Sequence, residues 1–222
     1  MNDLITQILR EEMQWSGRFL MLPREVQPMP ESVSKEKALE AIRTRLEKCN
    51  CCSLCKTAKN IVFGEGDHDA GIMFIGEAPG AVEDQTGRPF VGPAGKLLTD
   101  IIEKGMGLKR QDVYIANIAK CRPPGNRDPL PEEIRECIGF LDEQIEVIEP
   151  KVIVALGKVA AQTLLNTETS ISGLRGNFYE YKGVKVMPTY HPSYLLHNPA
   201  KKRDVWEDIK KVMVYLDIPL PK

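Results

Sequence analysis

Hydrophobic positions along the chain form short runs that alternate with stretches of helical spacing. Four runs rich in β-branched residues predict strands, and they lie at residues 72–76, 113–117, 152–157 and 184–190. Between and after them, apolar residues recur with the period of amphipathic helices at 95–104, 131–148, 158–165 and 200–216. Because strands that alternate with helices favour right-handed crossovers, we expect a three-layer α/β/α fold with a central, mostly parallel four-stranded sheet.

The first 48 residues follow a different pattern. Leu4, Ile5, Ile8 and Leu9 keep helical spacing, three prolines then interrupt it, and residues 35–47 resume it. We predict an N-terminal helical extension or linker at 1–48, which could dock a protein partner, and a single α/β domain at 49–222. A short hairpin is expected just before the last strand.

Composition narrows the class of protein. With 222 residues, of which 42% are hydrophobic, the chain can bury one sizeable core. A formal net charge of -1 gives no global basic field, so binding to nucleic acid would depend on a local patch. The N-terminus carries acids where a signal peptide needs an apolar core, and no run of about 18 apolar residues is present. We expect a soluble, cytoplasmic and monomeric protein.

The loops after the predicted strands are the place to look for chemistry. In parallel sheets, functional groups gather on loops at the carboxyl ends of the strands. The first strand is followed by GEAPG, Gly76 to Gly80, whose glycines allow close approach of a ligand to the backbone. This turn alone is weak evidence, since such turns are common between a strand and a helix.

Two residues in these loops suit recognition of a nucleobase. Phe90 lies in a polar, glycine-rich loop where an aromatic ring is poorly placed for the core, so it could form a stacking platform. Asn117 ends a buried strand, where an amide needs hydrogen-bond partners. Its oxygen could accept the N3–H of uracil while its nitrogen donates to O4, a pattern that cytosine presents reversed. A satisfied turn residue is the alternative for Asn117.

The last loop, HPSYLLHNP, adds further candidates. His191 directly follows a strand and lies on the same rim, although a lone histidine is often structural. Leu195 and Leu196 stand just before a basic helix start, AKKR, and paired apolar residues beside positive charge suit a wedge that unstacks a duplex. Filling of the core is the alternative for these leucines.

Three segments, taken in order, resemble the family 4 uracil-DNA glycosylases, which carry a [4Fe–4S] cluster. They are the stretch from GEAPG through RPFVG, then NIAKCRPPGNRDPLP, then HPSYLLHNP. The resemblance covers about residues 49–216. It implies a DNA-repair hydrolase that flips uracil out of single- or double-stranded DNA and cleaves its N-glycosidic bond. The sequence departs from the family at His197, where an arginine is common.

Cysteines supply candidate metal ligands. CNCCSLC contains two overlapping C-x2-C pairs, Cys49/Cys52 and Cys52/Cys55, and Cys121 and Cys137 are the only other cysteines. Four thiolates fit zinc or an iron–sulfur cluster equally well. The resemblance favours [4Fe–4S], held by Cys49, Cys52, Cys121 and Cys137 in an architectural role, because the family places its first pair at the position of Cys49 and Cys52 relative to VFGEG.

The same resemblance assigns roles at the base. His191 would donate a hydrogen bond to uracil O2 as the leaving group becomes negative. The backbone from Gly76 to Ala78 would hold the base edge, with Phe90 stacked on it. Related branches have an Asp or Asn at the position of Ala78 to position water, which alanine cannot do. Glu77 and Glu83 are therefore the candidate catalytic carboxylates, and Glu83 is the preferred one.

Two other classes of protein remain open on the residues alone. A non-catalytic iron–sulfur protein that binds nucleic acid would keep the cysteines and basic loops without needing Phe90, Asn117 and His191 together. A zinc-stabilised nucleotide hydrolase would use the same thiols for a different metal.

Overall fold

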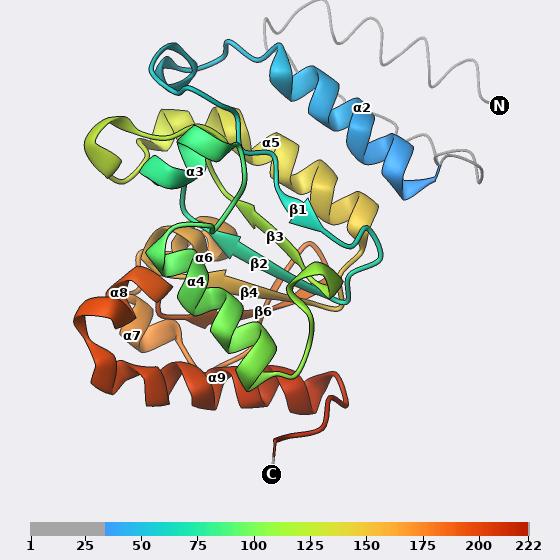
Figure 1. Cartoon of the computed structure of the whole chain (residues 1–222), viewed down its shortest axis with the longest axis vertical. Coiled ribbons are helices and arrows are strands. Elements are labelled where there is room, and N and C mark those ends of the chain that lie inside the picture. Colours follow the sequence, from blue (N-terminus) through green and yellow to red (C-terminus); the bar gives the residue numbers. More distant parts are fainter. Residues whose placement is uncertain (1–33, 222) are drawn as a thin grey trace, which may run out of the picture. The chain divides into compact units, whose positions relative to one another are not determined.

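The predicted strands form the parallel centre of a six-stranded sheet in the computed structural model, which describes residues 34–221 (Figure 1). The strand order is β1-β3-β2-β4-β6-β5. The four parallel strands are β2 (Ile72–Gly76), β3 (Tyr114–Asn117), β4 (Val152–Leu156) and β6 (Val184–Thr189). The antiparallel edge strands are β1 (Glu65–Gly66) and β5 (Tyr179–Tyr181). Pairing of β5 with β6 confirms the expected hairpin. Strand β1 was not predicted, because two residues are too few to show the period of a strand.

Alternate residues of each central strand enter different cores. In β2, Met73 and Ile75 face one core while Ile72 and Phe74 face the other, and all four are almost fully buried. This division follows from the two-residue period of a strand. Burial on both faces explains why the strands read as continuous apolar runs rather than as alternating ones.

Helices cover both faces of the sheet and confirm the three-layer α/β/α arrangement (Figure 1). The helices that pack on the Met73 face are α2 (Lys35–Glu47), α5 (Pro131–Ile148), α6 (Lys158–Leu165) and the short α7 (Ile171–Leu174). Those on the Phe74 face are α4 (Pro93–Asp100), α8 (Pro192–His197) and α9 (Lys202–Tyr215). The remaining helix is α3 (Ala81–Thr86), and the 3-10 and π turns are η1 (Ser53–Lys56), η2 (Ile101–Gly105), η3 (Arg110–Asp112), η4 (Pro124–Asn126) and η5 (Pro199–Lys201).

Helix α2 belongs to the folded unit, although the sequence places it in the N-terminal extension. It begins after Ser34, whose hydroxyl accepts the N–H of Lys37. Its apolar side chains, Leu39, Ile42 and Leu46, join the core beneath α5. The compact unit therefore begins at Ser34 and not at residue 49. The helix expected around Leu4 to Leu9 lies outside the described residues.

The topology brings all four parallel strands to one edge. Gly76 pairs with Asn117 at the ends of β2 and β3, and Leu156 pairs with Thr189 at the ends of β4 and β6. The chain leaves β2 towards β3 but leaves β4 towards β6, so the loops after these neighbouring strands diverge. Such a switch point is where open α/β sheets form ligand crevices. Across residues 34–221, every helix is too short or too polar to span a bilayer.

Candidate active site

A cavity of about 560 Å³ opens at the carboxyl edge of the sheet. Its walls come from the loops that follow all four parallel strands, and from α3 and the start of α6. The residues expected from sequence that line it are Glu77, Ala78, Glu83, Phe90, Asn117, His191 and Leu196. Side chains far apart in the chain therefore share one pocket, because parallel strands deliver their carboxyl ends to the same side.

Asn117 is the last residue of β3, and the oxygen of its side-chain amide is buried. The residue is 1% exposed, and its Oδ1 has no hydrogen-bond partner within residues 34–221. A buried polar atom without a partner costs about 1–3 kcal/mol. Because Asn117 lines the cavity, a ligand with a donor at the right position would remove this cost.

Phe90 lies deeper than the sequence suggests. It is 6% exposed and packs in the Phe74 core, so the expectation that its loop keeps it out of the core is wrong. Its ring still reaches the cavity and lies 5.6 Å from the ring of His191, measured between centroids. Phe90 adopts φ 50, an unusual value for a residue with a Cβ. The ring is thus fixed as one wall of the pocket.

Two glycines let the backbone approach these side chains. A Cβ on Gly76 would stand 2.5 Å from both Asn117 Oδ1 and Phe90 Cζ. Gly157 has φ 90, and a Cβ there would stand 2.9 Å from His191 Cβ. The close approach of Asn117 and Phe90 to one point on β2 shows that the amide and the phenyl ring border the same small space.

His191 is held as a neutral ring of defined tautomer. It precedes α8, and its Nδ1 accepts the backbone N–H of Ser193 at 3.1 Å and lies 2.7 Å from the Ser193 hydroxyl. Although part of the residue stays exposed through the pocket, the desolvation of its ring lowers the pKa of His191 to about 4. At neutral pH the ring proton therefore resides on Nε2, which is free to donate a hydrogen bond.

Glu83 is occupied by its own loop. Its Oε1 accepts the backbone N–H groups of Val91 and Gly92 at 2.9 and 2.8 Å. These bonds fix the segment that follows Phe90. Glu83 thus positions the phenyl ring, and the expectation that it is the preferred catalytic carboxylate loses support because Oε1 is already engaged.

Glu77 has a different environment. Desolvation, together with the nearby negative charge of Asp128, raises the pKa of Glu77 to about 7, while the positive charge of Lys158 acts in the opposite direction. All three residues line the cavity. Neither Asp128 nor Lys158 was singled out from sequence, because nothing in their spacing reveals that both loops fold towards Glu77.

Ala78 separates the pocket from the cysteine-rich region. It lines the cavity and also packs against the small cluster of Leu54, Ala119 and Cys121. A larger side chain would have to displace one side or the other. The methyl group provides no hydrogen-bonding atom, and the expectation that this position does not orient water stays a prediction.

The two leucines of the last loop lie in different environments. Leu195 is 1% exposed and belongs to the Phe74 core, so it cannot enter a duplex without leaving that core. Leu196 is 44% exposed and stands at the mouth of the cavity. The wedge prediction is therefore wrong for Leu195 and stays a prediction for Leu196. Adjacent helical residues point in different directions, which sequence alone could not resolve.

Alanine at each leucine should separate the two roles. Leu195→Ala is expected to lower the free energy of unfolding by about 2–5 kcal/mol, since it opens a cavity in the core. Leu196→Ala should change it by less than about 0.5 kcal/mol. Urea denaturation of both variants measures this difference. Similar losses of stability in the two variants would contradict the assignment.

The cysteines come together from three segments. Burial, together with the smaller effects of the neighbouring Cys137, Cys52, Cys49 and Cys55, raises the pKa of the Cys121 thiol to about 12. Burial likewise raises the pKa of the Cys49 thiol to about 11. Cys51 is exposed. Among residues 34–221, no three His, Cys, Asp or Glu side chains converge closely enough to hold a single metal ion. The donor set nevertheless consists of clustered thiols, which are the ligands that iron–sulfur clusters require.

Glu133 connects this region to the pocket and was missed from sequence. It is 1% exposed and forms an ion pair with Arg127 at 2.7 Å. It also accepts the N–H of Leu130 and the hydroxyl of Ser53, which adjoins Cys52. These contacts lower the pKa of Glu133 to about 2, the Arg127 hydrogen bond contributing most. The only advance signal is its place three residues after the helix N-cap.

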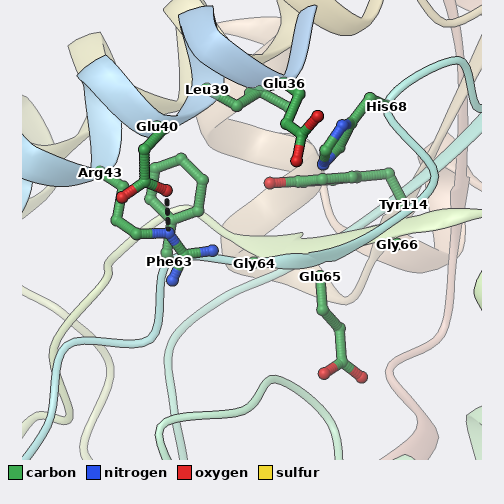
Figure 2. A pocket seen from close by; sticks show the side chains of 10 residues that line it. All are labelled: Glu36, Leu39, Glu40, Arg43, Phe63, Gly64, Glu65, Gly66, His68 and Tyr114. Atoms are coloured by element: carbon green, nitrogen blue, oxygen red, sulfur yellow. Dashed lines mark ion pairs between the residues drawn. The ribbon is translucent and has the colours of Figure 1, made fainter.

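A second cavity, of about 340 Å³, lies between α2 and β1 (Figure 2). Arg43 stacks on Phe63 at 4.5 Å from the ring centroid and pairs with Glu40 at 3.4 Å. Glu65 points away from the other labelled side chains in Figure 2, and it binds Arg88 and Arg110. Within this lining Arg43 and Glu40 pair with each other, and Glu65 pairs with arginines outside it. None of the candidate residues named from sequence lines this cavity, so the cavity at the carboxyl edge remains the candidate active site.

Comparison with known proteins agrees with this geometry. The family model of the uracil DNA glycosylase superfamily matches residues 63–210. The type-4 uracil-DNA glycosylase of Thermotoga maritima is 48% identical over 187 residues, which cover 82% of this chain and 97% of the relative. The type-4 enzymes of Archaeoglobus fulgidus and Saccharolobus solfataricus are 46% and 47% identical, over 79% and 78% of this chain and 92% and 84% of those relatives.

Proposed function

Because the chain belongs to the uracil DNA glycosylase superfamily, we propose that it removes uracil from DNA by hydrolysing the bond between the base and deoxyribose. The product is an abasic site, and the reaction is a step of DNA repair. The observation that carries this proposal is the Oδ1 of Asn117, which has no hydrogen-bond partner among the described residues and lies buried beside Phe90 in the same cavity as His191.

Uracil fits the hydrogen-bonding pattern of Asn117. The free Oδ1 accepts the N3–H of the base, and the amide nitrogen donates to O4. Cytosine has an acceptor at N3 and a donor at N4, so both contacts would become repulsive. Phe90 supplies an apolar face for the ring, and base–aromatic stacking contributes about 1–3 kcal/mol. The pocket thus selects uracil by shape and by polarity.

His191 stabilises the leaving group. Cleavage proceeds as the sugar becomes cationic and the uracil becomes anionic, with negative charge on O2. The Nε2–H of the neutral ring donates to O2, and a donor of this kind contributes about 3–4 kcal/mol to the transition state. A neutral histidine can make this contact. The backbone N–H of Ser193 donates to Nδ1, so the single ring proton lies on Nε2, which faces O2 in the proposed complex.

The two carboxyl groups act differently. Glu83 positions Phe90 through its bonds to Val91 and Gly92. Glu77 faces the base beside Asp128, and the backbone from Gly76 to Ala78 borders the base edge. Water adds to C1′ of the sugar cation that has already formed, and the proton that it loses is taken up by the departing uracil anion, so no carboxylate is required to generate hydroxide.

The thiols of Cys49, Cys52, Cys121 and Cys137 would hold a [4Fe–4S] cluster. The cluster would crosslink the segment before β1 to the loop after β3 and to α5, a purely structural contribution. Ser53 and Glu133 already join the same three segments by hydrogen bonds, which supports this arrangement. Cys52 with Cys55 is the alternative first pair, and the Cys55 thiol instead donates to the Cys52 carbonyl in this structure.

DNA would lie across the mouth of the cavity. Leu196 stands there, exposed, and would fill the space that the flipped nucleotide leaves. Lys158 offers a positive charge at the same rim. We further propose that the protein acts as a monomer in the cytoplasm, on single-stranded or duplex DNA, and that residues 1–33 contact a protein partner.

An excision assay tests the proposed function. The protein is incubated with oligonucleotides that contain uracil, hypoxanthine or only normal bases, and abasic sites are counted. Release of uracil, with none from the normal oligonucleotide, is the expected result. Absence of release from every substrate, with DNA binding retained, would favour a non-catalytic binding protein instead.

A further inference from the structure

Phe90 holds a backbone conformation that its own side chain does not favour. Its φ of 50 lies in the left-handed region, where a residue with a Cβ is unusual. Its carbonyl carbon is also so close to Gly95 that a Cβ on that glycine would stand 2.0 Å away. Such a conformation persists only where the surrounding structure fixes it. Because the ring is one wall of the active-site cavity, its direction depends on what holds the two peptide groups on either side of Phe90.

Glu83 holds the peptide group that follows Phe90. The N–H of this group belongs to Val91 and donates to Glu83 Oε1 at 2.9 Å. A peptide group is planar, so fixing its orientation fixes the adjoining dihedral, which here is ψ of Phe90. The dihedral φ depends instead on the peptide group before the ring.

Arg110 holds the peptide group that precedes Phe90. The oxygen of this group belongs to Pro89 and accepts a hydrogen bond from Arg110 Nη2 at 2.7 Å. Rotation of the group would break this bond and change φ of Phe90. Arg110 comes from η3, just ahead of β3, and its side chain is 16% exposed. A charged donor that is largely buried therefore bonds to the carbonyl beside the unusual residue.

Two further elements hold the guanidinium of Arg110. Its Nε and Nη2 donate to Glu65 Oε1 on β1 at 3.2 and 2.8 Å, and its Nη1 donates to Thr99 Oγ1 on α4 at 2.9 Å. The Thr99 hydroxyl donates in turn to the carbonyl of Gly95 at 3.0 Å, the glycine that lies against Phe90. A planar fork of donors suits such a junction, because its bonds have fixed relative directions.

Glu65 binds a second arginine, which provides a comparison. Arg88 Nε donates to Glu65 Oε2 at 2.8 Å, but the side chain of Arg88 is 62% exposed. Burial disfavours the charge on Glu65, yet the bonds from Arg88 and Arg110 outweigh it and lower the pKa of the carboxyl group. The two arginines thus share one anion, and Arg110 is the one that also bonds to Pro89.

We propose that Arg110 is a positioning residue for Phe90, which sets the plane of the stacking ring through the carbonyl of Pro89. With Glu83 on the other side, a charged side chain holds each of the two peptide groups that adjoin the ring. The lining of the active-site cavity, as residues 34–221 form it, does not include Arg110. Arg110 therefore acts on uracil through Phe90 and not by contact. This inference rests on the proposed function and adds a residue to it.

Arg110→Met keeps an unbranched side chain and removes every N–H donor of the guanidinium. The peptide group before Phe90 can then rotate towards an ordinary φ, and the ring leaves the plane of the base. Single-turnover excision of uracil should fall by about 10- to 100-fold, the cost of a small misplacement in a reactive complex. Free uracil should inhibit the variant more weakly, since the stacking contact is disturbed, while affinity for DNA with an abasic site should be nearly unchanged.

Two variants control for the general effect of a lost charge. Arg88→Met removes the other arginine from Glu65 and should leave excision and inhibition by free uracil as in the wild type. Arg110→Lys should lie between the wild type and Arg110→Met, because one ammonium group cannot reproduce the fork of bonds. It keeps a positive charge beside Glu65 and so tests the proposal even if Arg110→Met does not fold. Equal losses of excision in Arg88→Met and Arg110→Met, or wild-type rates in both Arg110 variants, would overturn the proposal.

A second readout does not depend on catalysis. The rings of the six phenylalanines can be labelled with carbon-13 and recorded by NMR in the full-length, DNA-free protein, with Phe90→Leu to identify the signal of Phe90. This signal should move in Arg110→Met and Arg110→Lys and stay in place in Arg88→Met. If the wild type releases no uracil while the signal moves in this way, the proposed function fails and the positioning role stands. If uracil is released and the Phe90 signal is the same in all these proteins, the positioning role fails alone.

Discussion

Asn117→Ala is expected to reduce uracil excision by a factor of about 10⁴, the discrimination that a site built around a substrate N–H can reach. In the proposed complex Asn117 is the side chain that accepts N3–H and donates to O4, and the variant removes both contacts. Its free energy of unfolding should change by less than about 1 kcal/mol. The Oδ1 of Asn117 has no partner within residues 34–221, which costs about 1–3 kcal/mol, so its loss offsets the cavity left by the shorter side chain.

Single-turnover rates and urea denaturation measure the two quantities, and affinity for DNA that already contains an abasic site serves as the control. That affinity should be nearly unchanged, since the amide contacts the base. Equal losses of excision and of DNA affinity would instead indicate damage to the fold. His191→Ala should behave in the same way, with a smaller loss of about 10²–10³.

Cys137→Ala has the largest expected effect on stability. Cys137 is 3% exposed on α5, and its loss should release the proposed cluster, which would tie α5 to the segments around Cys52 and Cys121. Structural metal sites contribute on the order of 10 kcal/mol, which is comparable to the whole stability of a domain. We expect the variant to purify without iron and to unfold below the temperature at which the wild type does. Iron and sulfide content and thermal denaturation provide the measurements.

Three further cysteine variants serve as controls for the ligand set. Cys51→Ala should retain the cluster, because this thiol is exposed and lies outside the proposed set. Cys49→Ala should lose it and Cys55→Ala should keep it. The reverse order for the last two would establish Cys52 and Cys55 as the first pair, and zinc in place of iron would refute the cluster.

The central layers of the fold could be predicted from sequence because each strand carries its own strong signal. Continuous apolar runs such as residues 72–76 occur where both faces of a strand are buried, and the helices between them show a clear period. The elements that were missed or misplaced lack such a signal. Strand β1 is two residues long, and α2 has the same pattern whether it docks on α5 or extends into a linker.

The sequence predicted which residues line the cavity better than it predicted what each of them contacts. Phe90, Asn117 and His191 follow different strands, and a parallel sheet brings strand ends together whatever the side chains are. What each group touches depends on loop conformation. The amides of Val91 and Gly92 engage Glu83, and the loop after η4 brings Asp128 into the wall of the cavity that Glu77 also lines. Neither arrangement leaves a period or a spacing in the sequence.

A crystal structure of the protein with free uracil would show whether Phe90, Asn117 and His191 recognise the base together. We expect one uracil stacked on Phe90, with its N3–H bonded to Asn117 Oδ1 and its O2 bonded to His191 Nε2. Uracil bound elsewhere, or bound in this cavity with the Asn117 amide and the His191 ring both turned away from it, would refute the proposed recognition.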